Sequence, residues 1–101
     1  MLKQAKILQE AGAFSILLEM VPEKCAKYIN ENLFVPTISC GAGRHCTGQV
    51  LVSDDVFGKF DGFTPRFARK YGDMKAFITE CAQKFDYDVK TGAFPNNEEV
   101  F

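Results

Sequence analysis

Three short apolar runs alternate with segments of helical periodicity, and this alternation constrains the fold more than any other feature of the sequence. The runs are AFSILL at 13–18, VPTISC at 35–40 and GQVLV at 48–52. Short, nearly continuous apolar runs are typical of strands covered on both faces, as in a parallel sheet. Their alternation with helical segments therefore predicts an α/β fold built on a parallel sheet.

The segments around these runs are predicted to be helices. Residues 2–11 and 22–33 each carry one apolar stripe, with Gly12 ending the first helix and Pro22 in the first turn of the second. Residues 65–71 are predicted to form a short helix, and a loop is predicted over 56–62. Asp73 is expected to cap a last helix that Gly92 ends. The predicted stripe residues are Leu2, Ala5, Leu8, Ala11, Cys25, Ala26, Ile29, Leu33, Met74, Phe77, Ile78, Cys81, Ala82 and Phe85.

The size and charge of the chain limit its class. With 101 residues, 47% of them apolar, we expect a single domain over 1–101 with an irregular tail at 93–101. A net charge of −1 with scattered basic residues argues against nucleic acid or an anionic membrane as a partner. No apolar run approaches the roughly 20 residues that span a bilayer.

The cysteines favour a reducing compartment. Cys25, Cys40, Cys46 and Cys81 form no CxxC pair, so we expect free thiols and a cytoplasmic location. His45 lies next to Cys46, but no second ligand pair follows at zinc-finger spacing, so no metal site is predicted.

Three parallel strands are few for a complete domain. Such a sheet has two exposed edges and leaves little room for a core. Glycines and charged residues follow the strands, at the positions where βα loops carry the active sites of barrels and doubly wound folds. The sequence therefore predicts part of a barrel rather than a whole one.

One carboxylate lies at the end of the first predicted strand. The stretch FSILLEMVP places Glu19 after an unbroken apolar run and closes it with Pro22. From the residues alone, the simpler interpretation is that Glu19 stabilises the N-terminus of the following helix through the helix dipole. A general base is the alternative.

Five short motifs, in order, carry a family resemblance. They are LEMVP at 18–22, GAG at 41–43, CTGQVLV at 46–52 followed by Asp54, FTPRF at 63–67 and TGAFP at 91–95. Together they make the whole chain resemble the C-terminal part of the ketopantoate hydroxymethyltransferase (3-methyl-2-oxobutanoate hydroxymethyltransferase) family. The resemblance implies a TIM (β/α)8 barrel of the phosphoenolpyruvate/pyruvate type, of which this chain is the last three βα units, strands six to eight.

The resemblance also implies an activity. The family transfers a hydroxymethyl group from 5,10-methylenetetrahydrofolate to 3-methyl-2-oxobutanoate, giving 2-dehydropantoate for pantothenate biosynthesis. Glu19 matches its general base, which removes a proton from C3 of the 2-oxo acid. Cys40, Val50 and Val52 match positions that line the pocket around the branched side chain. Ordinary core is the alternative for all three, and for Val50 and Val52 both interpretations can hold together. GAG is too short for a nucleotide motif and is expected to form a tight turn.

Not all of the family's site is expected here. The Mg2+ ligands and a substrate-binding lysine belong to earlier strands, so the resemblance assigns this chain no metal ligand. Asp54 matches an aspartate that follows the eighth strand, whereas Asp55 is expected to be a solvated loop residue. The family pattern has other residues at Ser39, Cys40, Thr47 and Ser53, and a longer closing segment.

Several possibilities remain for the chain as a whole. It is expected to be inactive alone, and to be a truncated gene product, one half of a split enzyme or an excised piece. Its expected partners are a small 2-oxo acid and either further copies of itself or a complementary N-terminal half. The alternative is a non-catalytic remnant that acts as an interaction module with itself or a full-length homologue. A lyase of the same superfamily is a weaker third possibility.

Overall fold

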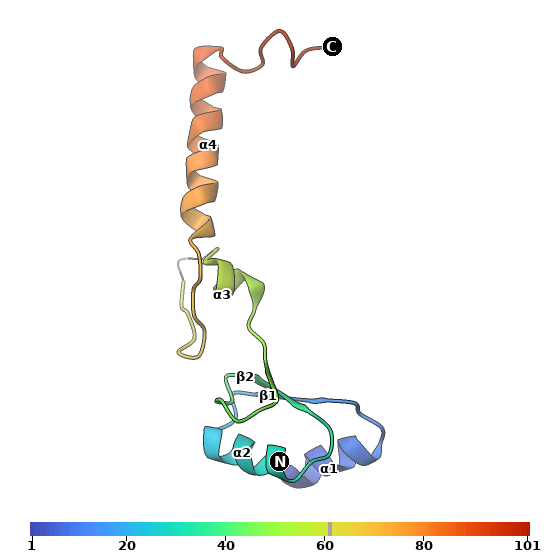
Figure 1. Ribbon diagram of the computed structural model, residues 1–101. Coiled ribbons are helices and arrows are strands. Elements are labelled where there is room, and N and C mark those ends of the chain that lie inside the picture. Colours follow the sequence, from blue (N-terminus) through green and yellow to red (C-terminus); the bar gives the residue numbers. More distant parts are fainter. Residues whose placement is uncertain (61) are drawn as a thin grey trace. The chain divides into compact units, whose positions relative to one another are not determined.

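The computed structural model describes residues 1–60 and 62–101, which form a mixed α/β structure with a parallel sheet. The prediction of an α/β fold is therefore confirmed. In chain order the elements are α1 (Leu2–Glu10), β1 (Ile16–Glu19), α2 (Glu23–Glu31), β2 (Thr37–Cys40), β3 (Gly48–Gln49), α3 (Ser53–Phe57) and α4 (Met74–Thr91) (Figure 1).

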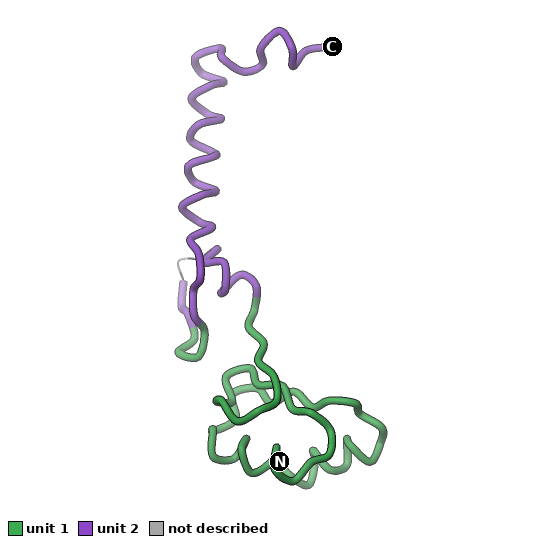
Figure 2. Tube along the Cα trace, in the orientation of Figure 1, with its two compact units in different colours: residues 1–52, 65–68 green, residues 53–64, 69–101 purple. Residues whose placement is uncertain are grey.

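The chain divides into two compact units, each of which is described by itself. The first comprises residues 1–52 and 65–68, and the second comprises 53–64 and 69–101 (Figure 2). The single partial-barrel domain over 1–101 stays a prediction.

The sheet of the first unit has the order β1-β2-β3, with both pairs parallel. Ile16 lies opposite Thr37 and Glu19 opposite Cys40. The third strand is shorter than the predicted 48–52, because only Gly48 and Gln49 pair with β2 as a strand. One further bond, from the N–H of Val50 to the carbonyl of Ser39 at 2.9 Å, continues the hydrogen-bond pattern past its end.

The core of this unit lies on one face of the sheet, where α1 and α2 pack (Figure 1). Its buried apolar residues are Ala5, Ile16, Leu18, Val21, Ala26, Ile29 and Ala42. On the opposite face, Leu17 is 53% exposed. The prediction of a first strand covered on both faces is therefore wrong for this unit, whose helices lie on the other side of the sheet.

Several helix predictions need correction. Leu8 is 52% exposed and Cys25 is exposed, so neither belongs to the buried stripe of its helix. Pro22 is the N-cap of α2 rather than a residue of its first turn. The predicted helix at 65–71 is only a turn, closed by the N–H of Ala68 on the carbonyl of Pro65 at 2.9 Å. A helix forms instead at Ser53–Phe57, overlapping the predicted loop.

The long helix of the second unit begins and ends where predicted. The N–H of Ala76 donates to Oδ1 of Asp73 at 2.9 Å, and Gly92 ends the helix with φ 74°. Its apolar stripe is not buried, since Phe77 is 66% and Phe85 57% exposed. No helix in the described ranges is long and apolar enough to cross a membrane.

Candidate active site at the carboxyl ends of the strands

The side chains of Glu19 and Cys40 lie on the same face of the sheet. Ile16 and Leu18 are buried under the helices, so the alternating residues Leu17 and Glu19 belong to the open face. Partners in a parallel register share a face, and Cys40 is the partner of Glu19. Both residues end their strands.

Val50 extends this row to the third strand. Gly48 pairs with Ile38, which shares the face of Cys40, and Val50 lies two residues further along. The bond from its N–H to Ser39 keeps it in register with the strand end. The structure thus brings three of the four predicted site residues to one edge of one face. Their chemical roles stay predictions.

Val52 lies outside this row, beyond the end of β3, and is 58% exposed. Asp54 and Asp55 belong to the second unit, in the first turn of α3. There Asp54 forms an ion pair with Lys59 at 3.6 Å between Oδ1 and Nζ.

A strained turn follows Glu19. The N–H of Met20 donates to the carbonyl of Cys40 at 2.9 Å, and Met20 has φ 50°, in the left-handed region. Residues other than glycine rarely adopt this backbone conformation. Where they do, contacts with the surrounding structure hold the backbone in place. The turn leads through the buried Val21 into α2.

The structure does not support the interpretation that Glu19 stabilises the N-terminus of α2. The acidic residue in the first turn of α2 is Glu23, and Pro22 occupies the N-cap. Within the described part of the chain, no side chain pairs with the Glu19 carboxylate, which is exposed on the open face. A carboxylate of this kind is available to a substrate.

The loop after Cys40 is fixed from two sides. Ser39, which is 1% exposed, accepts a hydrogen bond at its Oγ from the N–H of Ala42 at 2.9 Å. The Gln49 side chain donates from Nε2 to the carbonyl of Gly43, also at 2.9 Å. Gly41 and Gly43 have φ 72° and 84°, so GAG forms the predicted tight turn. Residues from the ends of β2 and β3 thus hold this loop.

One feature of this region was not predicted from the sequence. The Glu23 carboxylate lies 2.9 Å from Nε of Arg44 and 3.4 Å from Nε2 of His45. With Lys24 and Lys27, these residues line an open hollow beside the loop. No local pattern could have indicated it, because Glu23 is separated by 21 residues from Arg44.

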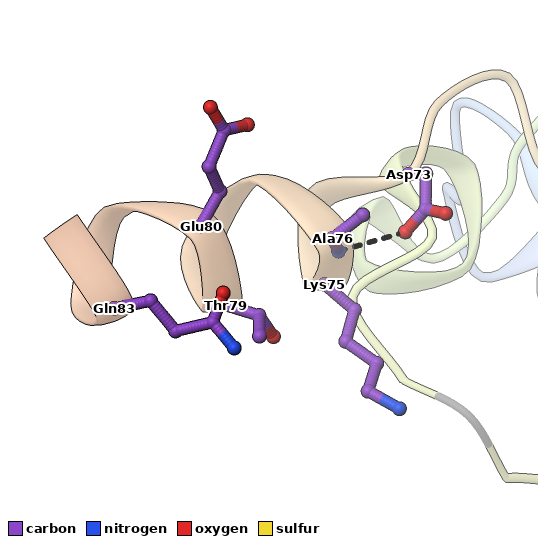
Figure 3. Close-up of a pocket in the computed structure, with 6 residues that line it drawn as sticks. All are labelled: Asp73, Lys75, Ala76, Thr79, Glu80 and Gln83. Carbon is purple, nitrogen blue, oxygen red and sulfur yellow. Dashed lines mark hydrogen bonds between the residues drawn. The ribbon is translucent and has the colours of Figure 1, made fainter.

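A second hollow lies along the start of α4 (Figure 3). Its lining residues are Asp73, Lys75, Ala76, Thr79, Glu80 and Gln83. Asp73 caps the helix, and Glu80 accepts a bond from Lys84 at 2.6 Å. All of the lining comes from one helix and its cap, so this hollow lies between neighbouring side chains of α4.

Comparison with known proteins decides the family. The family model described as ketopantoate hydroxymethyltransferase matches residues 1–97. The chain belongs to this family. Three curated relatives named 3-methyl-2-oxobutanoate hydroxymethyltransferase match over all 101 residues: those of Geobacter metallireducens at 45% identity, Pseudothermotoga lettingae at 46% and Clostridium botulinum at 42%. The chain spans only 38%, 38% and 37% of their respective lengths.

Membership of the ketopantoate hydroxymethyltransferase family raises the question of where magnesium would fit. Residues 1–60 and 62–101 contain no group of three or more His, Cys, Asp or Glu side chains that could hold a metal ion. Divalent magnesium is bound by oxygen ligands that include carboxylates. Among the described residues, the carboxylates are not gathered into a group of three or more.

Proposed function

We propose that this chain is the C-terminal part of a 3-methyl-2-oxobutanoate hydroxymethyltransferase, contributing the last three βα units of a TIM barrel of the phosphoenolpyruvate/pyruvate type. The complete barrel would transfer a hydroxymethyl group from 5,10-methylenetetrahydrofolate to 3-methyl-2-oxobutanoate, giving 2-dehydropantoate. The observation that carries this proposal is the position of Glu19, which ends β1 beside Cys40 on the open face of a parallel sheet. Active sites of such barrels lie at the carboxyl ends of the strands.

In this proposal Glu19 is the general base. Its carboxylate takes the proton from C3 of the 2-oxo acid, and the electron pair of the broken C–H bond forms the double bond of an enolate through the neighbouring carbonyl. Water would release the one-carbon unit from the folate as formaldehyde, with both C–N bonds breaking and their electron pairs staying on the folate nitrogens, which take up protons. C3 of the enolate would then bond to the formaldehyde carbon as the 2-oxo group re-forms. The formaldehyde oxygen would take the displaced electron pair and a proton, giving the hydroxymethyl group. Cys40 and Val50, in the same row as Glu19, would contact the branched side chain.

The same proposal makes the isolated chain inactive. Stabilisation of the developing charge usually contributes more to catalysis than any other single effect, and an enolate oxygen needs a positive or hydrogen-bonding group beside it. The open face that carries Glu19 also carries the exposed Leu17 and Val50, which offer no such group. The remaining strands of the barrel, from a complementary N-terminal half or as part of a longer chain, would supply it. We place the assembled enzyme in the cytoplasm, in keeping with four free cysteines.

Complementation tests this function. The chain is mixed with the N-terminal five-strand piece of a relative, and formation of 2-dehydropantoate from 5,10-methylenetetrahydrofolate and 3-methyl-2-oxobutanoate is followed. We expect activity in the mixture, no activity in either piece and a loss of at least about 100-fold in Glu19→Gln. Glu31→Gln, which changes an exposed carboxylate on α2, is the matched control. Full activity of Glu19→Gln in a working mixture contradicts the assigned role.

A non-catalytic interaction module is the second candidate. Leu17, Val50 and Val52 are 53%, 42% and 58% exposed, and in the described sheet β1 pairs with β2 alone. An exposed apolar face beside an unpaired strand edge favours association with another chain. Sedimentation of the isolated chain, with and without a full-length homologue, tests this candidate. A monomer that does not bind the homologue counts against it.

A further inference from the structure

The contacts of Glu23 join two segments that follow neighbouring strands. Glu23 begins α2, four residues after Glu19, while Arg44 and His45 follow the glycine turn after Cys40. Oε1 of Glu23 lies 2.9 Å from Nε of Arg44 and 3.4 Å from Nε2 of His45. One carboxylate oxygen therefore contacts two consecutive side chains of the 41–45 loop.

The aliphatic part of the same side chain also fits the loop backbone. A Cβ added at Gly43 would lie 2.5 Å from Cγ and 2.7 Å from Cβ of Glu23. The Glu23 side chain thus lies directly against Gly43, whose φ of 84° itself suits glycine. Glu23 thus attaches the loop at a third point, in addition to the hydrogen bonds made by Ser39 and Gln49.

We propose that Glu23 is a positioning residue, whose carboxylate holds Arg44 and His45 and so fixes the 41–45 loop beside the strand ends that carry Glu19 and Cys40. The purpose of this positioning rests on the proposed function, because a fixed loop matters to catalysis only if a substrate binds at that edge. The attachment itself does not rest on that function. The side chains of Arg44 and Glu23 are 83% and 41% exposed, so the attachment is partly solvated and acts on local loop order rather than on global stability.

Amide hydrogen exchange of the full chain tests the attachment. In Glu23→Gln we expect backbone amides at 41–47 to exchange roughly two- to five-fold faster, with an unchanged urea midpoint. Glu31→Gln, which removes the 3.8 Å ion pair with Lys27 on the same helix, should leave exchange at 41–47 unchanged. Equal exchange in the two variants, or a loss of protection throughout the sheet, overturns the proposal.

Swapping the charges of Glu23 and Arg44 tests whether their ion pair, and not packing alone, holds the loop. Glu23→Arg places two guanidinium groups together and should speed exchange at 41–47 more than Glu23→Gln does. Combining it with Arg44→Glu restores an opposite-charge pair between the same positions, and the double variant should exchange more slowly than Glu23→Arg alone. If the second substitution brings no recovery, the carboxylate does not hold the loop through charge.

The complementation assay then tests positioning for catalysis. Loosening a loop at the binding edge adds an ordering cost to substrate binding, so we expect Glu23→Gln to raise KM for the 2-oxo acid about three-fold, with a smaller change in kcat. An unchanged KM in an active mixture overturns the link to substrate binding. A mixture that is inactive even with the unsubstituted chain counts against the proposed function. The hydrogen-exchange measurements do not need an active mixture, so they still test whether Glu23 holds the loop.

Discussion

The backbone N–H of Met20 donates to the carbonyl of Cys40 at 2.9 Å, so β1 and β2 remain joined one residue past the end of their register. This bond crosses directly beside Glu19, which precedes Met20 and lies opposite Cys40. The first strand then leaves the sheet through a residue with φ 50°. Met20, the one described residue other than glycine with a positive φ, thus directly follows the candidate base.

The first prediction concerns this constraint. Met20 is 70% exposed, so Met20→Gly removes little packing and relieves a left-handed conformation that costs a residue with a Cβ roughly 1 kcal/mol. We expect the free energy of unfolding, measured with urea, to rise by up to about 1 kcal/mol, partly offset by the greater entropy of glycine in the unfolded chain. Met20→Ala is the control and should bring no such gain. A Met20→Gly variant that is no more stable than Met20→Ala would contradict the strain.

The second prediction concerns Gly41 and the ring of Phe67. A Cβ at Gly41 would lie 2.6 Å from two ring atoms, and the residue has φ 72°. Gly12 has φ 96° with nothing within 4 Å of an added Cβ, so it provides a matched control. We expect Gly41→Ala to lower the free energy of unfolding by about 1 kcal/mol more than Gly12→Ala does, because it adds steric overlap to the backbone strain.

Partial recovery in the double variant Gly41→Ala with Phe67→Ala, relative to the sum of the single changes, would confirm that the overlap involves the ring. Equal costs for the alanines at Gly41 and Gly12 would contradict the close approach and leave the conformation of the backbone as the whole effect.

The third prediction concerns the hydroxyl of Ser39. Ser39 is 1% exposed and accepts the N–H of the fully buried Ala42, so Ser39→Ala leaves a buried donor without its partner. We expect a loss of about 1–3 kcal/mol in the free energy of unfolding. Ser53→Ala, at an exposed serine, should change it by less than about 0.5 kcal/mol. Urea unfolding of both variants measures the difference, and similar values for the two would contradict the role given to this hydroxyl.

The parts of the fold that local patterns determine were predictable from the sequence. The Asp73 cap and the Gly92 stop of α4 are set by neighbouring residues, and the structure places them as expected. The prediction of a helix at 65–71 was wrong. Thr64 followed by Pro65 suits the beginning of a helix, but the described hydrogen bonds close one turn only, because a first turn does not ensure that a helix continues. Burial was harder to predict, since it depends on what covers a face, as the exposed Leu17 illustrates.

For the candidate site too, features set by local sequence were predictable, and features set by contacts between distant segments were not. The glycine turn and the strand-end position of Glu19 could be inferred from sequence order, whereas the pairing of Glu19 with Cys40 needed the register of the sheet. The contacts of Glu23 with Arg44 and His45 join distant parts of the chain, and no spacing rule indicates them.

The last prediction concerns the start of α4. Oδ1 of Asp73 accepts the N–H of Ala76 at 2.9 Å and so satisfies one of the backbone donors that the first turn leaves free. Asp73→Ala removes this acceptor and should cost about 1 kcal/mol of helix stability, whereas Asp73→Asn keeps an oxygen at the same place and should cost less. Backbone amide exchange at the first turn of α4 measures the effect directly, because a frayed turn exposes those amides first. Exchange in Asp73→Ala that matches the unsubstituted chain would mean that the helix start is held by something other than this carboxylate.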